Sequence, residues 1–292
     1  MPEPIAAARN VSKIFDTKVA LDDVSAQVFP GDIIGVLGKN GAGKTTLLET
    51  MLGFSPPTKG STSVFGESSM QLSATAKARI GFVPQQDELL GVLDGKQLLA
   101  IVAAFHAHWD RAFVGRLVAE WGVPLDRRIS TLSVGERQKL AVLSSLGHHP
   151  DLLVLDEPVA SLDPIARRQF LHELFAIAES TSRAVLFSSH IVSDLERAAN
   201  RVWIVKDGRL HWQGEIDALK ESVVRLQIRA RKPLPPDLGV PNALATRVEG
   251  LVAQATVAKW EPAATDTLAR RLDAAVDIEP LGLEEIFLEL HR

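Results

Sequence analysis

Apolar and polar side chains follow one another along this chain in three different patterns. Residues 5–28 alternate apolar and polar side chains, which predicts half-buried antiparallel strands. The runs at 32–37, 152–155 and 184–187 are apolar almost throughout, as expected of parallel strands that are buried on both faces. From Glu88 to about Pro124 the apolar positions recur at helical spacing. The chain is therefore predicted to be an α/β protein with a helical region inserted between its strands.

The end of the chain repeats this mixture on a smaller scale. A helix is expected at 215–221, and a loop around Pro233 to Pro236. Beyond that first helix, the pattern predicts strands at 223–230, 245–248 and 251–260 and helices at 265–275 and 283–290. We therefore expect one domain at 1–221 and a small α+β accessory domain at 222–292, for which support of a dimer and regulation are both hypotheses.

Composition and charge narrow the class of protein. The chain has 292 residues, a net charge of −4 and no cysteine. The charge argues against a nucleic-acid partner held by bulk electrostatics, and the lack of cysteine excludes disulfides and thiolate metal sites. The first residues are not expected to form a signal peptide, and no apolar run approaches the roughly 18 residues of a membrane span. A cytoplasmic setting is expected.

A glycine-rich stretch follows the apolar run at 32–37 and precedes a helical pattern. It reads Gly38-Lys39-Asn40-Gly41-Ala42-Gly43-Lys44-Thr45-Thr46. Strand, glycine loop and helix in this order are the context of a phosphate-binding P-loop, in which backbone N–H groups and the helix N-terminus face the phosphates. Lys44 is predicted to reach the β- and γ-phosphates and Thr45 to ligate Mg²⁺. The sequence thus predicts a nucleoside triphosphate site.

Polar side chains follow three of the predicted strands. The strand at 152–155 ends in two adjacent carboxylates, Asp156 and Glu157. Because ligands of open α/β sheets bind at the carboxyl ends of strands, Asp156 is a candidate ligand of Mg²⁺, and Glu157 a candidate base for the water that attacks the γ-phosphate. Gln85 is a candidate to ligate Mg²⁺ or orient water, and His190 to sense the γ-phosphate.

Three other features each allow two interpretations. Phe15 is either a core residue or a platform on which adenine stacks. Ser133 either only caps the helix that follows it or also faces an anion. His106 and His108 stand two residues apart and face different directions on a helix, so packed or solvated histidines are favoured over a metal site.

Taken together, these motifs resemble the ATP-binding subunit of an ABC transporter over about residues 5–218. The matching elements are the Walker A loop from Gly38 to Thr45, the Q-loop Gln85, the signature Leu132-Ser133-Val134-Gly135-Glu136, the Walker B Asp156 with Glu157, the D-loop Ser161-Leu162-Asp163, the switch His190 and the aromatic A-loop position at Phe15. The resemblance favours the adenine platform for Phe15. It implies an ABC-type P-loop NTPase fold with a mixed sheet core, an antiparallel β subdomain, a helical subdomain at about 88–145, and ATP and Mg²⁺ as cofactors.

The resemblance also implies how the residues work. Two such domains bind head-to-tail, with ATP held between the Walker A loop of one and the signature of the other. Ser133 and Gly135 would then contact the γ-phosphate across the dimer, and Asp163 would lie at the nucleotide site. Glu157 would be the general base, and His190 would orient the γ-phosphate and water.

Two segments narrow the resemblance further. Residues 105–110 and 281–290 look like those of ABC-2 type exporters, in which the ATPase works with a separate transmembrane permease subunit. We therefore expect an ATP-hydrolysing subunit that acts as a homodimer or as a heterodimer with a related ATPase, without a nucleic-acid partner. Its expected location is peripheral, on the cytoplasmic face of the inner (plasma) membrane.

Two other functions are weighed against this one. A soluble ABC-type ATPase acting on ribosomes or DNA is disfavoured by the single Walker A loop and the absence of sustained heptads. A degenerate, non-hydrolysing partner subunit is suggested by two departures from the family signature, because Val134 replaces its first glycine and Glu136 its glutamine. Glu157 and His190 count against degeneracy. Because Ser133 and Gly135 remain, we expect a working but weaker signature.

Overall fold

The computed structural model describes residues 3–86, 88–159 and 183–291, together with residues 162, 164, 167–168, 170–172 and 175. The chain divides into two compact units, Met1–Gln213 and Gly214–Arg292. Each unit has a hydrophobic cluster of its own. Ser161 and Asp163 of the predicted D-loop lie outside the described residues. No helix in the described part of the chain is long and apolar enough to cross a membrane.

An antiparallel sheet is formed near the N-terminus. Its strands are β1 (Ala6–Phe15), β2 (Lys18–Val28), β4 (Lys59–Val64) and β5 (Glu67–Ser68), in the order β2-β1-β4-β5. The pairing of β1 with β2 confirms the antiparallel strands predicted for residues 5–28. A short 3-10 helix, η1 (Ser69–Gln71), and helix α2 (Ala74–Lys77) follow β5.

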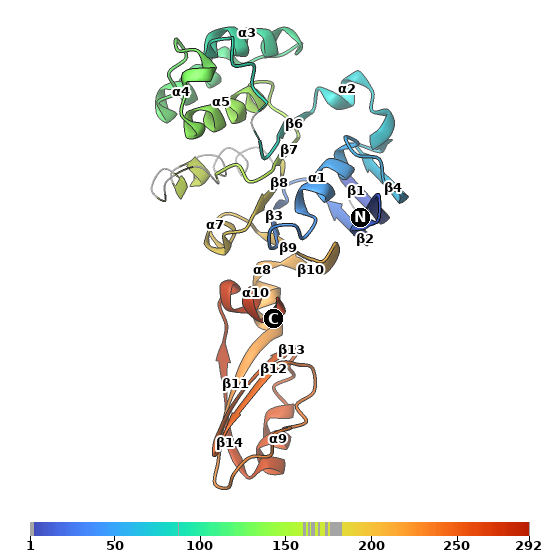
Figure 1. Ribbon diagram of the computed structural model, residues 1–292, viewed down its shortest axis with the longest axis vertical. Helices are drawn as coiled ribbons and strands as arrows, with labels where there is room; N and C mark the ends of the chain where they lie inside the picture. The colour runs from blue at the N-terminus through green and yellow to red at the C-terminus, as the bar shows by residue number, and fades with distance from the viewer. Residues whose placement is uncertain are drawn as a thin grey trace. The chain divides into compact units, whose positions relative to one another are not determined.

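A six-stranded sheet forms the second layer of this unit. Its strands are β3 (Ile33–Leu37), β6 (Ile80–Val83), β7 (Leu152–Leu155), β8 (Ala184–Ser189), β9 (Arg201–Lys206) and β10 (Arg209–Glu215), in the order β10-β9-β3-β8-β7-β6. β3, β6, β7, β8 and β9 pair in parallel, which confirms the buried parallel strands predicted from the apolar runs. Helix α1 (Lys44–Leu52) lies close to strands of both sheets (Figure 1). It buries Leu47, Leu48 and Met51 in one hydrophobic cluster with residues of both sheets.

The predicted helical region lies between β6 and β7. It contains α3 (Gly95–Ala104), α4 (Arg111–Trp121), the 3-10 helix η2 (Ile129–Thr131) and α5 (Val134–Leu146), and the three α-helices gather together (Figure 1). Each α-helix begins where a side chain accepts a hydrogen bond from the first turn: Asp94 caps α3, Asp110 caps α4 and Ser133 caps α5. A later short helix, α7 (Val192–Glu196), follows β8.

Two histidines of the helical region stack on each other. The rings of His106 and His148 lie 3.9 Å apart at an angle of 13°, and Nε2 of His148 is 3.1 Å from the carbonyl oxygen of Ile80 in β6. His108 is exposed. In the described part of the chain, no group of three or more His, Asp or Glu side chains is arranged to hold a metal. His106 is therefore a packed histidine and His108 a solvated one.

Protonation of His148 in this stack is expected to lower the stability of the fold in acid. Burial, followed by the positive charges of His106, His149 and Arg183, lowers the pKa of His148 to about 4 from its usual 6.5. Because the unfolded chain binds this proton at higher pH than the folded chain, stability is lost as the pH falls from 6.5 to 4. His148→Gln, which retains a donor for Ile80, should show a shallower loss in urea denaturation midpoints across this range. His108→Gln is the control, and equal slopes for all three proteins would contradict the expectation.

The second unit is an antiparallel sheet with helices. Its elements are α8 (Ile216–Ser222), β11 (Val223–Ala230), β12 (Ala243–Glu249), β13 (Val252–Ala258), α9 (Ala264–Leu272), β14 (Ala274–Pro280) and α10 (Leu283–Leu290), with strand order β12-β13-β11-β14. The predicted helix at 265–275 was too long, and β14 was missed. Asp273 ends α9 in a left-handed conformation with φ of +48°, and the residues after it alternate as a strand that pairs with β11.

Candidate functional site

The predicted P-loop connects β3 to α1. Gly41 and Gly43 have φ of +80° and +108°, which side chains rarely allow. A Cβ atom on Gly43 would lie 2.7 Å from the carbonyl oxygen of Ala20, and one on Gly38 would lie 2.6 Å from that of Val205. Gly41 and Gly43 are therefore needed for their backbone conformation. Gly38 and Gly43 are needed because a side chain there would collide with a neighbouring carbonyl oxygen. Lys39, Asn40 and Gly41 are exposed, Ala42 and Lys44 are buried, and Thr45 and Thr46 are half-buried.

Lys44, the first residue of α1, points its ammonium group at both backbone and carboxylate. Its Nζ atom donates to the carbonyl oxygen of Gly38 at 2.9 Å and lies 3.3 Å from Oε1 of Glu157. Both side chains are more than nine-tenths buried. A buried carboxylate without a cation would be costly, so Lys44 and Glu157 stabilise each other's charge.

The end of β7 is held in place from two sides. Glu157 has φ of +50°, and its N–H donates to Oγ of Ser188 at 2.8 Å. Ser188 in turn donates to Oδ1 of Asp156, while Nε2 of Gln138 in α5 donates to the carbonyl oxygen of Glu157 at 2.9 Å. Ser188 and Gln138 were missed from the sequence. A serine near the end of an apolar strand and a glutamine on the buried side of a helix were the available signals.

His190 completes the surroundings of Glu157. Its Nδ1 atom lies 2.8 Å from Oε2 of Glu157, so the carboxylate is held between an imidazole and the ammonium of Lys44. The imidazole is 44% exposed, whereas the carboxylate is buried. A carboxylate that is held by an imidazole next to a phosphate-binding loop is suited to take a proton from water.

Other residues predicted for the site lie around this centre. Phe15 ends β1 and is 46% exposed, so it is not part of the core. Gln85 is exposed two residues after β6, at the sheet edge where the N–H of Asp156 donates to the carbonyl oxygen of Val83. Among the described residues, the hydrogen bonds and ion pairs do not join Phe15, Gln85 or Ser133 to Glu157.

The predicted signature forms the start of α5. Ser133 Oγ accepts from the N–H of Glu136, and Glu136 Oε2 accepts from the N–H of Ser133 at 2.7 Å. The backbone N–H of Ser133, followed by its hydroxyl and by the charge of Arg127, lowers the pKa of the Glu136 carboxyl. Val134 is the first helical residue and is half exposed, so this position does not require the left-handed conformation of glycine. Neither departure from the family signature disrupts the start of the helix, and Gly135 follows on its first turn.

The carboxylates near Asp156 create a negative potential. Burial, followed by the charges of Asp156 and Glu88, raises the pKa of Glu49 in α1. Asp156 is 1% exposed, and the Ser188 hydroxyl that donates to its Oδ1 is a neutral group. A cation at this edge would relieve the repulsion, and Asp156 together with the hydroxyl of Thr45 supplies the oxygen ligands that Mg²⁺ prefers.

Comparison with known proteins agrees with this geometry. Residues 21–160 match the family model described as ABC transporter. The chain is 33% identical over 291 residues to the Nod factor export ATP-binding protein I of Burkholderia thailandensis, covering 97% of this chain and 95% of that protein. It is 29% identical to the bacitracin transport ATP-binding protein BcrA of Bacillus licheniformis, over 74% of this chain and 72% of that protein.

Solved structures match the fold of about three quarters of the chain. The structure of an ATP-binding subunit of an ABC transporter gives a TM-score of 0.67 at 24% identity, covering 74% of this chain and 92% of the other. A dimeric post-hydrolysis state of the ATP-binding cassette MJ0796, bound to ADP and Pi, gives 0.65 at 20% identity, covering 72% and 98%. The arrangement of P-loop, sheets and inserted helices is thus that of known ATP-binding cassettes.

Proposed function

Because this chain belongs to the ATP-binding proteins of the ABC transporter family, we propose that its ATPase cycle drives export of a substrate through a separate membrane subunit of the ABC-2 type. The relative named for Nod factor export supports this direction of transport, and the relative named for bacitracin transport supports a transport function. One observation carries the proposal: Lys44, Glu157 and His190 meet at the end of the P-loop. Such a subunit must hydrolyse ATP and must present a surface that contacts the membrane subunit.

The proposed reaction uses the three side chains in sequence. The phosphates of ATP compete with Glu157 for the ammonium of Lys44, because they are the stronger anion at the same loop. Glu157, released from Lys44, accepts a proton from the water that attacks the γ-phosphorus atom. The bond between the γ-phosphorus and the β–γ bridging oxygen breaks, and that oxygen leaves with ADP. His190, which remains within reach of Glu157, orients the γ-phosphate.

Mg²⁺ is part of this proposal. Thr45 and Asp156 would hold it, and Gln85, at the same edge of the sheet, is proposed as a third ligand. When bound, Mg²⁺ neutralises charge on the β- and γ-phosphates. The charge of Asp156, which after burial raises the pKa of Glu49, supports a cation at this edge.

A head-to-tail dimer would complete the site. Ser133 and Gly135 stand at the N-terminus of α5, whose unpaired N–H groups favour an anion. Ser133 is exposed, and its hydroxyl, which faces the Glu136 carboxylate in this chain, can turn to a phosphate of a partner chain. We propose that a second copy of this chain is the partner, with Asp163 of the D-loop near the shared nucleotide.

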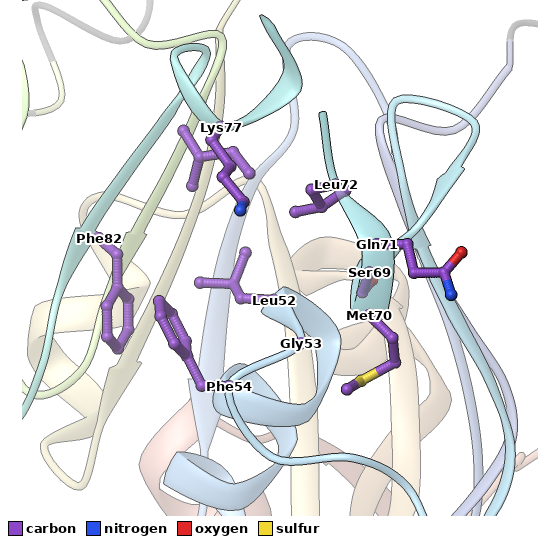
Figure 2. Close-up of a pocket in the computed structure, with 10 residues that line it drawn as sticks. Leu52, Gly53, Phe54, Ser69, Met70, Gln71, Leu72, Lys77 and Phe82 are labelled. Carbon is purple, nitrogen blue, oxygen red and sulfur yellow. The ribbon is translucent and has the colours of Figure 1, made fainter. Parts of the chain in front are cut away.

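An apolar pocket supports contact with the membrane subunit. It has a volume of about 390 Å³ and is lined mainly by apolar side chains, those of Leu52, Phe54, Met70, Leu72, Ile80 and Phe82. Figure 2 shows Phe54 beside Phe82, with Met70 on the other side of the pocket. Phe54 is 64% exposed although it is aromatic. We call this the Phe54 pocket.

A second set of exposed apolar side chains continues from the Q-loop into the helical region. Leu90, Val92, Ile101 and Phe105 are all exposed, and Phe105 is 82% exposed. A surface on which large apolar side chains are exposed together is typical of a contact with a partner. We propose that the permease subunit covers the Phe54 pocket and this apolar surface, which places the chain on the cytoplasmic face of the inner membrane.

Charged substitutions on this surface should release the chain from the membrane. Phe54→Asp combined with Phe105→Asp places two carboxylates in the proposed apolar contact, where desolvation would oppose docking. In cells that contain the permease, the wild-type chain is expected in the membrane fraction and the double variant in the soluble fraction, with unchanged ATP binding. Leu251→Asp, at an exposed apolar position of the second unit, is the matched control. A double variant that sediments with membranes like the wild type would contradict the proposed surface.

The two parts of the chain are proposed to divide this work. Residues 1–221 would form the ATPase domain, and residues 222–292 an accessory domain that supports dimerisation or regulation. The small sheet of the accessory part carries ion pairs between neighbouring strands, such as Arg225 with Glu279 and Arg229 with Asp277. Removal of residues 233–292 without any change in dimerisation, ATPase rate or transport would contradict both roles.

A further inference from the structure

Lys13 makes two contacts that fix an otherwise exposed side chain. Its Nζ atom lies 4.7 Å from the centre of the Phe15 ring, within the range of a cation–π interaction. The same Nζ atom donates a hydrogen bond to the carbonyl oxygen of Pro56 at 2.7 Å. A surface lysine gains little from one weak contact, but here both contacts favour the same position of the ammonium group, beside the ring.

The tip of the β1–β2 hairpin is tied to the segment that follows α1. The N–H of Ile14 donates to Oγ1 of Thr58 at 3.0 Å, and the N–H of Thr58 donates to the carbonyl oxygen of Ser12 at 2.8 Å. Together with the bond from Lys13 to Pro56, these contacts hold the end of β1 against the segment between α1 and β4. The ring of Phe15 is thereby carried on a tip with restricted movement.

The other strand of the hairpin leads to the P-loop. The carbonyl oxygen of Ala20 in β2 lies against Gly43, the residue before Lys44, and the N–H of Gly208 donates to the carbonyl oxygen of Ala42 at 2.9 Å. The N–H of Asp22 donates to Gly208 in turn. Phe15 therefore belongs to a hairpin whose second strand is fixed to the phosphate-binding loop.

We propose that Lys13 is a positioning residue for the base of ATP. Its ammonium group covers one face of the Phe15 ring and holds the ring in one orientation, so that the other face is ready to stack on adenine. A ring fixed before binding loses less conformational entropy when the base arrives. This proposal rests on the proposed nucleotide site and adds to it a residue that acts on the base through Phe15, without touching the phosphates.

The test separates binding of the base from binding of the phosphates. Isothermal titration calorimetry on the full chain, with Mg²⁺, measures Kd for ATP and for inorganic tripolyphosphate, which has no base. Lys13→Met is expected to raise Kd for ATP about two- to fivefold, the range of an exposed cation–π contact, and to leave Kd for tripolyphosphate unchanged. Phe15→Leu is expected to raise Kd for ATP by at least about fivefold, again without effect on tripolyphosphate.

Three further variants make the test specific. Lys13→Arg keeps a cation over the ring and should restore the affinity for ATP. Lys13→Met should have no further effect in the Phe15→Leu background, because the lysine acts through the ring. Lys59→Met removes an exposed charge from β4, where Lys59 pairs in register with Ser12, and should bind ATP like the wild type.

Several results would overturn the proposal. Lys13→Met could raise Kd equally for ATP and for tripolyphosphate, or raise neither. It could also raise Kd for ATP by the same factor in the Phe15→Leu background as in the wild type. Each of these results would mean that Lys13 does not position the base. A wild-type chain that binds neither ATP nor tripolyphosphate would instead contradict the nucleotide site itself, so the two failures are distinguishable.

Discussion

Glu157→Gln is expected to abolish ATP turnover and to leave ATP binding intact. Glutamine has nearly the same shape as glutamate, so the amide can occupy the same position between Lys44 and His190. It cannot accept the proton of the attacking water, and loss of a general base lowers rates by about 10²- to 10⁴-fold. The variant also removes the carboxylate that competes with phosphate for Lys44, so ATP binding is not expected to weaken.

Two measurements on purified protein check this result. Steady-state ATP hydrolysis compares the wild type with Glu157→Gln, and size-exclusion chromatography in ATP shows whether the inactive variant dimerises. Glu120→Gln, an exposed carboxylate on α4, is the matched control and should turn over ATP like the wild type. Turnover by Glu157→Gln close to that of the wild type would exclude Glu157 as the base. A wild type that is inactive and monomeric would mean that the chain needs its membrane subunit or a different ATPase partner.

The parts of the site that local sequence encodes could be predicted before the structure. The P-loop depends on glycine, lysine and threonine at fixed spacing between a strand and a helix, and all of these lie within a few residues of each other. Asp156 and Glu157 could be placed because a fully apolar run predicts a buried strand and ligands bind at the ends of such strands. The capped start of α5 at Ser133 was likewise readable from a short pattern.

Contacts between distant segments could not be predicted in the same way. Ser188 and Gln138 reach the backbone of Glu157 only because β8 lies beside β7 and because α5 packs near the end of β7. Neither side chain belongs to a motif, so their role follows from strand order. The error at β14 was of another kind, since residues 265–275 contain enough helix-forming residues to hide the turn at Asp273. Intrinsic preference was overridden there by pairing with β11.

Mixing two inactive variants is expected to restore ATP turnover. Glu157→Gln removes the base from the Walker half of each site, and Gly135→Asp places a negative charge at the signature, where it opposes the γ-phosphate of the partner's ATP. An aspartate in the first turn of a helix favours the helix itself, so Gly135→Asp should fold. In a head-to-tail dimer of the two variants, one site has both Glu157 and Gly135 intact, and the other site has neither.

Recovery of ATP turnover in the mixture distinguishes a head-to-tail homodimer from a dimer with a related ATPase. If equal amounts of the two variants exchange freely, about half of the dimers are mixed and each has one intact site out of two, so turnover should reach at most about a quarter of the wild-type rate. Each variant alone should stay inactive under the same conditions. Recovery in the mixture requires that the signature of one copy serves the ATP of the other, because neither chain can build a working site from its own residues. Failure to recover, with both variants folded and the wild type active, would exclude a head-to-tail homodimer and favour a related ATPase as the partner.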